Sequence, residues 1–308
     1  MTDFHLPLVN LQKADVQPLR IPALNAKKVT ADVLRLDKIH PVVSGNKWFK
    51  LKYHLQEVLS THYQGILTFG GAWSNHIVAA AFGAQYAGIR SIGIIRGEEP
   101  QKESYTLAAA KGYGMQLVHT DRKSYSRKND PSYLDELRNK FGHPYIIPEG
   151  GGGAPGIIGS EEILSLTNQE KYSHVICSIG SGTMYIGLAN ALLPGQEFMG
   201  VPVMKGMHNV PGDSHTFSND PRKYNQCKIS DRYHFGGYAR KSPLLFEFMN
   251  NFYTETGIPT DFVYTGKLMF ACIDLIENNY YPAGSNLLII HSVGLQGNRS
   301  LPVGTLVF

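Results

Sequence analysis

Short apolar runs alternate with helical segments along most of this chain, and this alternation limits its fold more than any other feature. Residues 66–69 predict a buried strand, and residues 76–87 predict a helix of small residues that ends at Gly88. Strands separated by helices of this length imply right-handed βαβ crossovers and a parallel sheet. The chain is therefore predicted to have an α/β fold with parallel-rich sheets. The predicted strands are 31–36, 66–69, 91–95, 115–119, 175–179 and 286–291, and the predicted helices are 76–87, 104–111, a segment ending near 193, and 268–276.

The length of the chain allows two lobes, each with its own hydrophobic core. The chain has 308 residues, and single cores stop growing at about this size. A glycine-rich run at 150–156 interrupts the alternation and is a predicted boundary between lobes. The expected division is a small lobe at 50–152 and a large lobe made of 1–49 and 153–308.

Composition and charge narrow the class of partner. The formal net charge is +4 without a long basic run, which fits small anionic ligands and does not suggest nucleic acid. Cys177, Cys227 and Cys272 form no C-x-x-C pair and are expected to be reduced and buried. The first residues lack a signal-peptide pattern, and no apolar stretch is long enough to cross a bilayer. We therefore expect a soluble, cytoplasmic protein with a small-molecule partner and without a metal site.

The run Ser44-Gly45-Asn46-Lys47 places a lysine where an apolar helical segment begins. Near a helix N-terminus, the helix dipole and partial burial favour the neutral amine, which can form a Schiff base with an aldehyde. Lys50 follows three residues later on nearly the same helix face, where its charge would favour the neutral form of Lys47 or help to bind an anion. A surface turn followed by a solvated basic helix is the alternative.

Two glycine-containing turns are predicted to bind anions. The run Gly70-Gly71-Ala72-Trp73-Ser74-Asn75-His76 presents backbone N–H groups and small polar side chains at a helix start, which suits a carboxylate. An ordinary helix N-cap explains the same residues. Residues 180–183, Gly-Ser-Gly-Thr, lie at a strand–helix junction and suit a phosphate, although a simple tight turn is the alternative. This run matches neither a P-loop nor the dinucleotide-binding spacing.

Four motifs, in the order found here, resemble those of the 1-aminocyclopropane-1-carboxylate (ACC) deaminase and D-cysteine desulfhydrase family. They are Ser44-Gly45-Asn46-Lys47 with Lys50-Leu51, the run 70–76, the run 180–183, and Val263-Tyr264-Thr265-Gly266-Lys267. Members of this family are pyridoxal-phosphate enzymes of fold type II, the two-lobed, three-layer, tryptophan synthase β-like fold. The resemblance implies that pyridoxal 5'-phosphate lies between the lobes, that the large lobe binds it, and that the protein is a homodimer.

The resemblance also implies a role for each matched residue. Lys47 would hold the cofactor through an imine. The substrate amine would then replace Lys47 in that imine, and the released Lys47 would take the α-proton. Asn75 would touch the ring oxygen of the cofactor, while Ser74 and His76 would face the substrate carboxylate. The implied catalytic residues are Lys47, Ser74, Tyr238 and Tyr264; the cofactor-binding residues are Lys47, Lys50, Asn75, Gly180, Ser181, Gly182, Thr183 and Thr265; the substrate-binding residues are Ser74, Asn75 and His76.

The two tyrosines would assist proton transfer. Tyr238 follows Phe235-Gly236-Gly237, and Tyr264 precedes Thr265 in the fourth motif. Half-buried packing is the alternative for both, because the chain has 17 tyrosines.

Four residues depart from the family pattern. Phe49 replaces an arginine and Trp73 replaces a glutamine, while Thr265 and Ser292 stand where ACC-opening relatives have glutamate and leucine. A carboxylate beside the pyridine nitrogen keeps it protonated and makes the ring a deep electron sink. A threonine hydroxyl can only hydrogen-bond the nitrogen. The weaker electron sink that results suffices for β-elimination but suits poorly the opening of a cyclopropane. Thr265 and Ser292 therefore favour the desulfhydrase over the ACC deaminase.

The predicted activity is that of a pyridoxal-phosphate-dependent deaminating lyase, similar to D-cysteine desulfhydrase, that converts a small amino acid to a 2-oxo acid and ammonia. ACC deaminase is the alternative enzyme. A cofactor-binding protein without turnover stays open as a second class. A sugar-phosphate-binding α/β protein would share the loop 180–183 but leaves the lysine motif unexplained.

Overall fold

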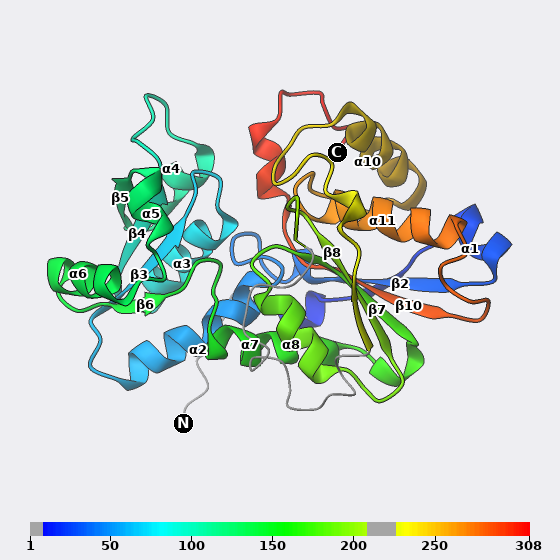
Figure 1. Cartoon of the computed structure of the whole chain (residues 1–308), viewed down its shortest axis with the longest axis horizontal. Helices are drawn as coiled ribbons and strands as arrows, with labels where there is room; N and C mark the ends of the chain where they lie inside the picture. The colour runs from blue at the N-terminus through cyan, green and yellow to red at the C-terminus, as the bar shows by residue number, and fades with distance from the viewer. Residues whose placement is uncertain (1–8, 208–225) are drawn as a thin grey trace. The chain divides into compact units, whose positions relative to one another are not determined.

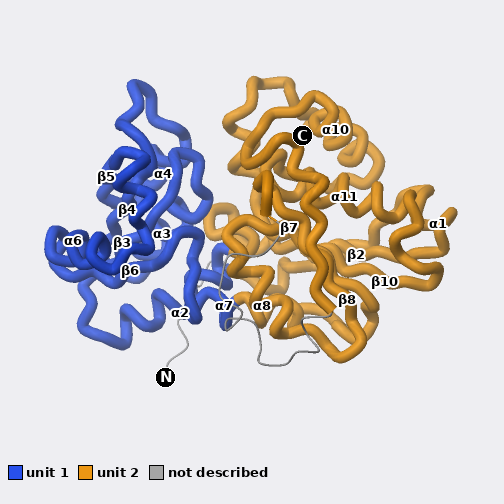
Figure 2. The backbone as a smooth tube through the Cα atoms, viewed as in Figure 1, with its two compact units in different colours: residues 1–9, 47–159 blue, residues 10–46, 160–308 orange. Residues whose placement is uncertain are grey.

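The computed structural model describes residues 9–207 and 226–308. The chain forms two compact units, coloured separately in Figure 2. Unit 1 contains Lys47–Gly159, and unit 2 contains Asn10–Asn46 and Ser160–Phe308. The expected small lobe, 50–152, falls within unit 1, and its assignment as a lobe stays a prediction.

Unit 1 is built on a four-stranded sheet with the strand order β5-β4-β3-β6, in which all three pairs are parallel. A parallel sheet was predicted for this part of the chain and is confirmed. Its strands are β3 (Gly65–Gly70), β4 (Arg90–Arg96), β5 (Gln116–Thr120) and β6 (Tyr145–Ile147); its helices are α2 (Lys47–Ser60), α3 (Asn75–Tyr86), α4 (Tyr105–Gly112), α5 (Arg122–Ser126) and α6 (Pro131–Phe141), and α7 (Ala154–Glu161) crosses the unit boundary.

Helix α3 shows why these residues form a buried helix. Ser74 is its N-cap and accepts a hydrogen bond from the amide of Ile77 (3.3 Å). Three consecutive alanines, 79–81, are fully buried in the middle of the helix. A Cβ at Gly83 would meet Leu55 of α2 at 2.9 Å, so the missing side chain allows α2 to pack closely. The small residues therefore let α3 pack against β3, β4 and α2.

Unit 2 contains a six-stranded sheet with the order β1-β2-β10-β7-β8-β9, in which only β1 is antiparallel to its neighbour. The strands are β1 (Val16–Pro18), β2 (Thr30–Arg35), β7 (His174–Ile179), β8 (Glu197–Pro202), β9 (Cys227–Ile229) and β10 (Asn286–His291). The helices are α1 (Pro22–Lys27), α8 (Thr183–Ala191), α10 (Pro243–Thr256) and α11 (Thr265–Glu277). The 3-10 helices are η1 (Leu11–Lys13), η2 (Leu36–Lys38), η3 (Leu164–Leu166), η4 (Gln169–Lys171), η5 (Asp231–Tyr233) and η6 (Leu295–Ser300).

Helices cover both faces of the unit 2 sheet (Figure 1). Met199 of β8 belongs to the hydrophobic core that contains Leu268 of α11. Its neighbour Phe198 points to the opposite face and stacks on Tyr185 of α8, with ring centroids 4.6 Å apart. The unit therefore has three layers, helix–sheet–helix, and the predicted α/β fold with parallel-rich sheets is confirmed.

The cysteines and the helix lengths add two findings. None of the three cysteines, all within the described residues, forms a disulfide, and Cys177 and Cys272 are buried as expected. Cys227 is only partly buried because it lies in β9, the short strand at the edge of the sheet, so its predicted burial was wrong. Within 9–207 and 226–308, every helix is too short or too polar to cross a membrane.

Candidate active site

The turn before Lys47 is held by the segment that follows β10. Gly45 has φ +64°, and a Cβ there would lie 2.1 Å from the carbonyl oxygen of Ser292. The amide of Asn46 donates to the same oxygen (2.8 Å), and the Ser44 hydroxyl donates to the Asp37 carbonyl (3.0 Å). The backbone of Ser292, one of the two residues that depart from the ACC-opening pattern, therefore supports this turn, and Ser292 itself is buried.

The same turn contacts the start of α8. The side-chain amide of Asn46 donates to the sulfur of Met184 (3.2 Å). Met184 directly follows Thr183, the last residue of the predicted phosphate loop. Asn46 directly precedes Lys47 in the chain. The structure thus brings together the first and third motifs of the sequence through a contact inside unit 2.

Lys47 is the first residue of α2, as the sequence predicted. Lys47 and Lys50 are buried, with 9% and 5% of their surfaces exposed. Buried lysines are rare unless they have a partner or a ligand, which argues against a solvated basic helix. Phe49, which replaces the family's arginine, is 1% exposed, and a Cβ at Gly159 would collide with its carbonyl oxygen. Phe49 therefore serves packing.

Ser74, Asn75 and His76 lie together at the start of α3, with Ser74 as the N-cap. Asn75 Oδ1 and His76 Nδ1 are buried and have no hydrogen-bond partner among the described residues. Buried polar atoms without partners are uncommon in folded proteins. The two atoms therefore point to a ligand that supplies hydrogen bonds here.

The protonation of His76 follows from its neighbours. The Thr68 hydroxyl donates its hydrogen to the Ile147 carbonyl (2.9 Å), so it can only accept from His76 Nε2, 2.7 Å away. Burial holds the pKa of His76 well below its usual range, and the charges of Lys47 and Lys50 lower it further. His76 is therefore neutral, with its proton on Nε2 and a lone pair on Nδ1.

A lone pair on Nδ1 would repel a carboxylate. The expectation that His76 faces the substrate carboxylate therefore conflicts with its hydrogen bonding, and an N–H or O–H group is the better partner. Ser74 and the α3 N-terminus keep the features that a carboxylate needs. Trp73, next to them, is 44% exposed, and its effect on substrate shape stays a prediction.

The loop Gly180–Thr183 joins β7 to α8. Gly182 is the N-cap of α8, with φ +88°, and within the described chain no side chain caps this end. The hydroxyls of Ser181 and Thr183 lie 3.2 Å apart. Helix N-termini attract phosphates through their amide groups and dipole. The loop therefore fits the phosphate group that the sequence assigned to it.

Tyr264 approaches both this loop and Tyr238. A Cβ at Gly180 would lie 3.0 Å from the ring of Tyr264, so any larger residue there would require the ring to shift. The Tyr264 hydroxyl donates to the Tyr238 hydroxyl (3.3 Å), and the rings meet edge to face with centroids 6.0 Å apart. The two predicted tyrosines therefore form a pair in unit 2.

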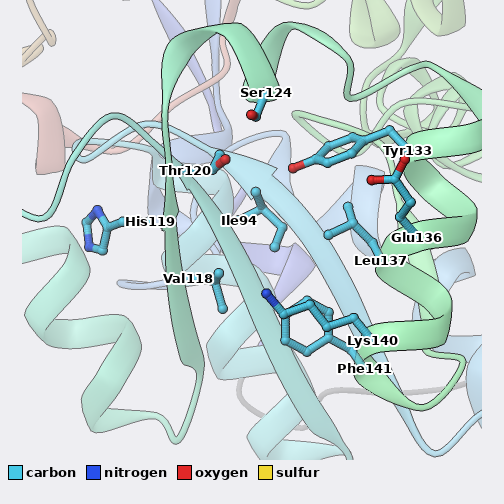
Figure 3. Close-up of a pocket in the computed structure, with 10 residues that line it drawn as sticks. All are labelled: Ile94, Val118, His119, Thr120, Ser124, Tyr133, Glu136, Leu137, Lys140 and Phe141. Carbon is cyan, nitrogen blue, oxygen red and sulfur yellow. The ribbon is translucent and has the colours of Figure 1, made fainter.

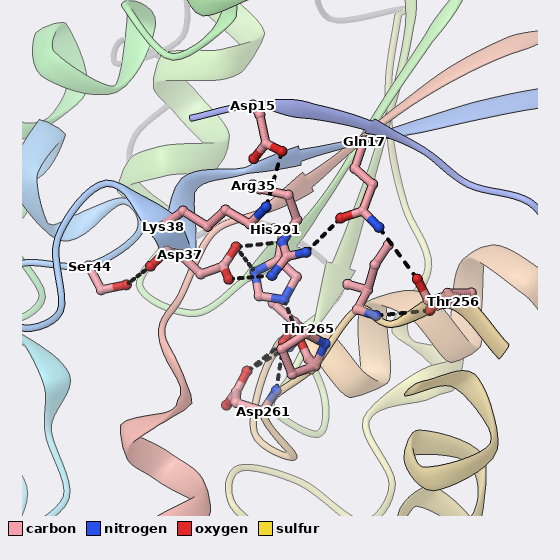
Figure 4. Close-up of polar contacts among 12 residues, drawn as sticks. Asp15, Gln17, Arg35, Asp37, Lys38, Ser44, Thr256, Asp261, Thr265 and His291 are labelled. Carbon is pink, nitrogen blue, oxygen red and sulfur yellow. Dashed lines mark hydrogen bonds and ion pairs between the residues drawn. The ribbon is translucent and has the colours of Figure 1, made fainter. Parts of the chain in front are cut away.

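Thr265 has a partner that the sequence analysis missed. Its hydroxyl donates to Asp261 Oδ1 (2.9 Å) and accepts from the Asp261 amide (2.8 Å), as Figure 4 shows in part. The carboxylate of Asp261 also accepts the amides of Val263, Tyr264 and Thr265. Asp261 thus anchors the start of α11. Thr265 is fully buried, and its predicted contact with the cofactor nitrogen stays a proposal.

Unit 2 also contains a buried network of the polar and charged side chains of Arg35, Asp37 and His291 (Figure 4). Arg35 donates two hydrogen bonds to Asp37, at 2.8 and 2.7 Å. His291 Nε2 lies 2.8 Å from the Pro259 carbonyl, and its Nδ1 lies 3.0 Å from Asp37 Oδ1. Burial alone would raise the pKa of Asp37, but the bonds from Arg35 and the charge of His291 hold it well below its usual range.

Replacing Asp37 with asparagine is expected to cost about 3–5 kcal/mol of unfolding free energy at pH 7, because the buried guanidinium of Arg35 loses its counter-charge. The folded-state pKa of Asp37 is depressed, so its stabilisation is complete above the unfolded value, near pH 4, and is lost as the pH falls further. Urea unfolding of wild type and Asp37→Asn between pH 7 and pH 2 measures this. The gap should stay constant to about pH 5 and then shrink.

Asp15→Asn is the matched control, because Asp15 forms an exposed ion pair with Lys38 (3.0 Å). Such pairs contribute about 0–1 kcal/mol. A gap for Asp37→Asn that is as small as that of the control would contradict the buried network.

The predicted site residues fall into two groups. Lys47, Lys50, Ser74, Asn75 and His76 lie in unit 1, where the charges of both lysines act on His76. Gly180, Ser181, Gly182, Thr183, Tyr238, Tyr264 and Thr265 lie in unit 2. Asp261 was not predicted, although an aspartate just before a helical segment is a recognisable N-terminal signal.

A pocket of about 250 Å³ in unit 1 is separate from these residues (Figure 3). Figure 3 shows Tyr133, Thr120 and Ser124 along one part of it, with Lys140 and Phe141 at another. None of the predicted site residues lines it. Among the described residues, no group of three or more histidine, cysteine or acidic side chains could hold a metal ion.

Each group, taken by itself, offers features that suit a part of pyridoxal phosphate. A buried lysine at a helix start, orphaned acceptors on α3 and an uncapped glycine N-terminus on α8 correspond to an aldehyde, polar ring substituents and a phosphate. The cofactor of this family would therefore find suitable side chains and backbone groups.

The comparison with known proteins agrees with a pyridoxal-phosphate site. The chain is 28% identical over 271 residues to a Pyrococcus abyssi protein provisionally named an ACC deaminase, covering 83% of this chain and 81% of that one. It is 26% identical over 281 residues to a protein named D-cysteine desulfhydrase from Klebsiella pneumoniae, covering 85% and 86%. The solved structure of an ACC deaminase homologue superposes with a TM-score of 0.76 and 26% identity, covering 94% and 92%.

The family described as pyridoxal-phosphate dependent enzymes matches residues 14–293. That range includes both groups of predicted site residues. The chain therefore belongs to the pyridoxal-phosphate dependent enzymes, and its cofactor is pyridoxal 5'-phosphate.

Proposed function

We propose that the protein is a deaminating lyase of the D-cysteine desulfhydrase type. D-cysteine and water would yield pyruvate, ammonia and hydrogen sulfide: the α-C–H and Cβ–S bonds break, and water then replaces the nitrogen at Cα, which leaves as ammonia. The observation that carries this choice is Thr265, a buried hydroxyl bound to Asp261 where ACC-opening relatives have a glutamate. The Klebsiella relative's name supports the same choice. Release of pyruvate and sulfide from D-cysteine by the purified protein tests it.

Bound pyridoxal phosphate supplies the electron sink for the carbanion that α-proton loss creates. Lys47 holds the cofactor and afterwards takes the α-proton, which its position at the start of α2 supports. Lys50 and the loop Gly180–Thr183 bind the phosphate. Ser74 and the first amides of α3 bind the substrate carboxylate, while His76 Nδ1 accepts a hydrogen bond from an N–H or S–H group of the substrate.

Asn75 supports ring binding. Its Oδ1 is buried without a partner among the described residues, and turning the amide would present its NH₂ group to an oxygen. Tyr238 and Tyr264 share a hydrogen bond and would relay protons as a pair. Thr265 would face the ring nitrogen while its own hydrogen stays on Asp261.

Lys50→Ala is expected to weaken cofactor binding about 10- to 150-fold without removing the covalent linkage to Lys47. Loss of one charge-assisted hydrogen bond costs about 1.5–3 kcal/mol, which corresponds to that range. Titration of the cofactor-free protein with pyridoxal phosphate, followed by absorption, measures the change. Lys52→Ala on the same helix is the control, because Lys52 is only half-buried and lies over the Tyr53 ring. Equal affinities for both variants would contradict the phosphate role.

ACC deamination is the second candidate function. The provisional name of the Pyrococcus relative and the name of the solved homologue favour it. ACC deamination needs a strong electron sink at the ring nitrogen. In the proposed arrangement Thr265 faces that nitrogen, and its hydroxyl is hydrogen-bonded to the buried carboxylate of Asp261. We also propose that the enzyme is a cytoplasmic homodimer, as the family resemblance implies.

A further inference from the structure

Lys267 is a fully buried lysine that the proposed chemistry does not use. It lies in the first turn of α11, and 0% of its surface is exposed. Its ammonium group donates to the carbonyl of Gly237 (2.8 Å) and to the carbonyl of Val203 (3.2 Å). A buried lysine is costly unless it is hydrogen-bonded. The hydrogen bonds to the two carbonyls offset this cost, and Lys267 in turn holds the two carbonyls in place.

The loop that contains Gly237 is strained. Phe235 and Ala239 have φ values of +50° and +52°, and Gly236 and Gly237 have +86° and +122°. Non-glycine residues in the left-handed region are strained and persist where neighbouring structure holds them. The loop therefore needs an anchor.

Two contacts attach this loop to α11. The first is the Lys267 ammonium on the Gly237 carbonyl. The second is Phe235, whose ring meets Phe270 edge to face with centroids 4.9 Å apart. Lys267 and Phe270 are three residues apart and lie on the same side of the helix. The polar contact is adjacent to Tyr238, because Tyr238 directly follows Gly237.

The partner of Tyr238 is attached to the same helix. Tyr264 is the N-cap residue of α11 and lies three residues before Lys267. Its hydroxyl donates to Tyr238 at 3.3 Å. One buried ammonium group thus links the backbone beside Tyr238 to the helix that carries Tyr264. The Val203 carbonyl extends the link to the residue after β8.

We propose that Lys267 is a positioning residue that holds Tyr238 at hydrogen-bonding distance from Tyr264. The inference rests on the proposed function, because it concerns the tyrosine pair assigned to proton transfer there. Burial lowers the pKa of Lys267 to about 8, against the charge of Asp261, so at neutral pH the group is mostly a charged donor. A charged donor forms stronger hydrogen bonds than a neutral amine.

The test combines Lys267→Met with Tyr238→Phe. Lys267→Met should lower kcat for D-cysteine about 10- to 100-fold and change KM by less than about threefold, which lies within the usual contribution of one proton-transfer group. In the Tyr238→Phe background the same substitution should change kcat by less than about twofold, because the hydroxyl that it positions is gone. Equal effects in both backgrounds would overturn the proposal.

Lys241→Met is the control, since Lys241 is exposed, lies close to the same loop and donates to the Ser300 carbonyl. It should leave kcat unchanged. A loss of kcat like that of Lys267→Met would show that any lysine removed near the loop has the same effect, and this would also overturn the proposal.

Amide hydrogen exchange in the cofactor-free protein gives a readout that does not depend on the substrate. Residues 235–240 should exchange faster in Lys267→Met than in wild type or Lys241→Met. Unchanged exchange would overturn the proposal, whatever the substrate proves to be. If the methionine variant does not fold, Lys267→Gln, which keeps one donor group, replaces it in every arm. Faster exchange with Tyr238→Phe fully active would show that Lys267 holds the loop but that Tyr238 has no catalytic role, which refutes the inference as stated.

Discussion

Lys47→Ala is expected to remove the covalent cofactor linkage and to lower turnover at least about 1,000-fold. Lys47 is the buried first residue of α2, directly after a turn that is held by Ser292 and Met184. It would supply both the amine that holds the cofactor and the base that removes the α-proton, and each role is large. Borohydride reduction followed by peptide mapping identifies the lysine that carries the cofactor, and a turnover assay measures the loss.

Lys47→Arg distinguishes the effect of the positive charge at position 47 from the effect of the covalent linkage to the cofactor. Arginine keeps the positive charge but does not form the linkage, so it should be as inactive as alanine. Lys50→Ala should retain the reducible adduct when cofactor is in excess. If Lys47→Ala kept a borohydride-reducible adduct at full stoichiometry, the assignment of Lys47 would be wrong.

The strands and helices with strong apolar patterns were predictable from the sequence. The strand at 286–291 agrees with β10 (Asn286–His291), and the helix at 76–87 agrees with α3 to within one residue at each end. Three short strands, β1, β6 and β9, have three residues each. An apolar pattern cannot develop in three residues, so these strands depend on neighbours that only the folded chain brings together.

The sequence allowed us to predict which residues belong to the site, but not which other residues they contact. The sequence shows that Gly45 precedes Lys47, but the reason for glycine is the carbonyl of Ser292, far along the chain. The tautomer of His76 depends on Thr68 and, through it, on Ile147. Such side-chain networks follow from the tertiary structure, so the position of the proton on His76 could not be derived from the sequence.

Thr265 shows the same limit. Its difference from glutamate was visible in the sequence, whereas its hydrogen bond to Asp261 was not. Replacing Thr265 with glutamate would place a second carboxylate beside a buried one, and burial already raises the pKa of Asp261 above its ordinary value. Substrate choice is therefore best tested on the wild-type protein.

The wild-type protein is expected to release a 2-oxo acid and ammonia from D-cysteine and from β-chloro-D-alanine, and to open ACC slowly or not at all. The physical reason is Thr265, whose hydroxyl gives its hydrogen to Asp261 and offers no carboxylate of its own to the ring nitrogen. A thiolate or chloride leaves readily once the α-proton is lost, whereas ACC has no α-hydrogen and needs the deeper sink.

The measurement that tests this most directly is side-by-side turnover of D-cysteine, β-chloro-D-alanine and ACC by the cofactor-loaded wild-type protein. Lys47→Ala serves as the blank, and 2-oxo acid and ammonia are quantified for each substrate. We predict that both D-amino acids react at least about tenfold faster than ACC, a difference of about 1.4 kcal/mol in activation free energy. Faster turnover of ACC than of both D-amino acids, or no turnover of any of the three by a protein with its cofactor bound, would contradict the desulfhydrase assignment.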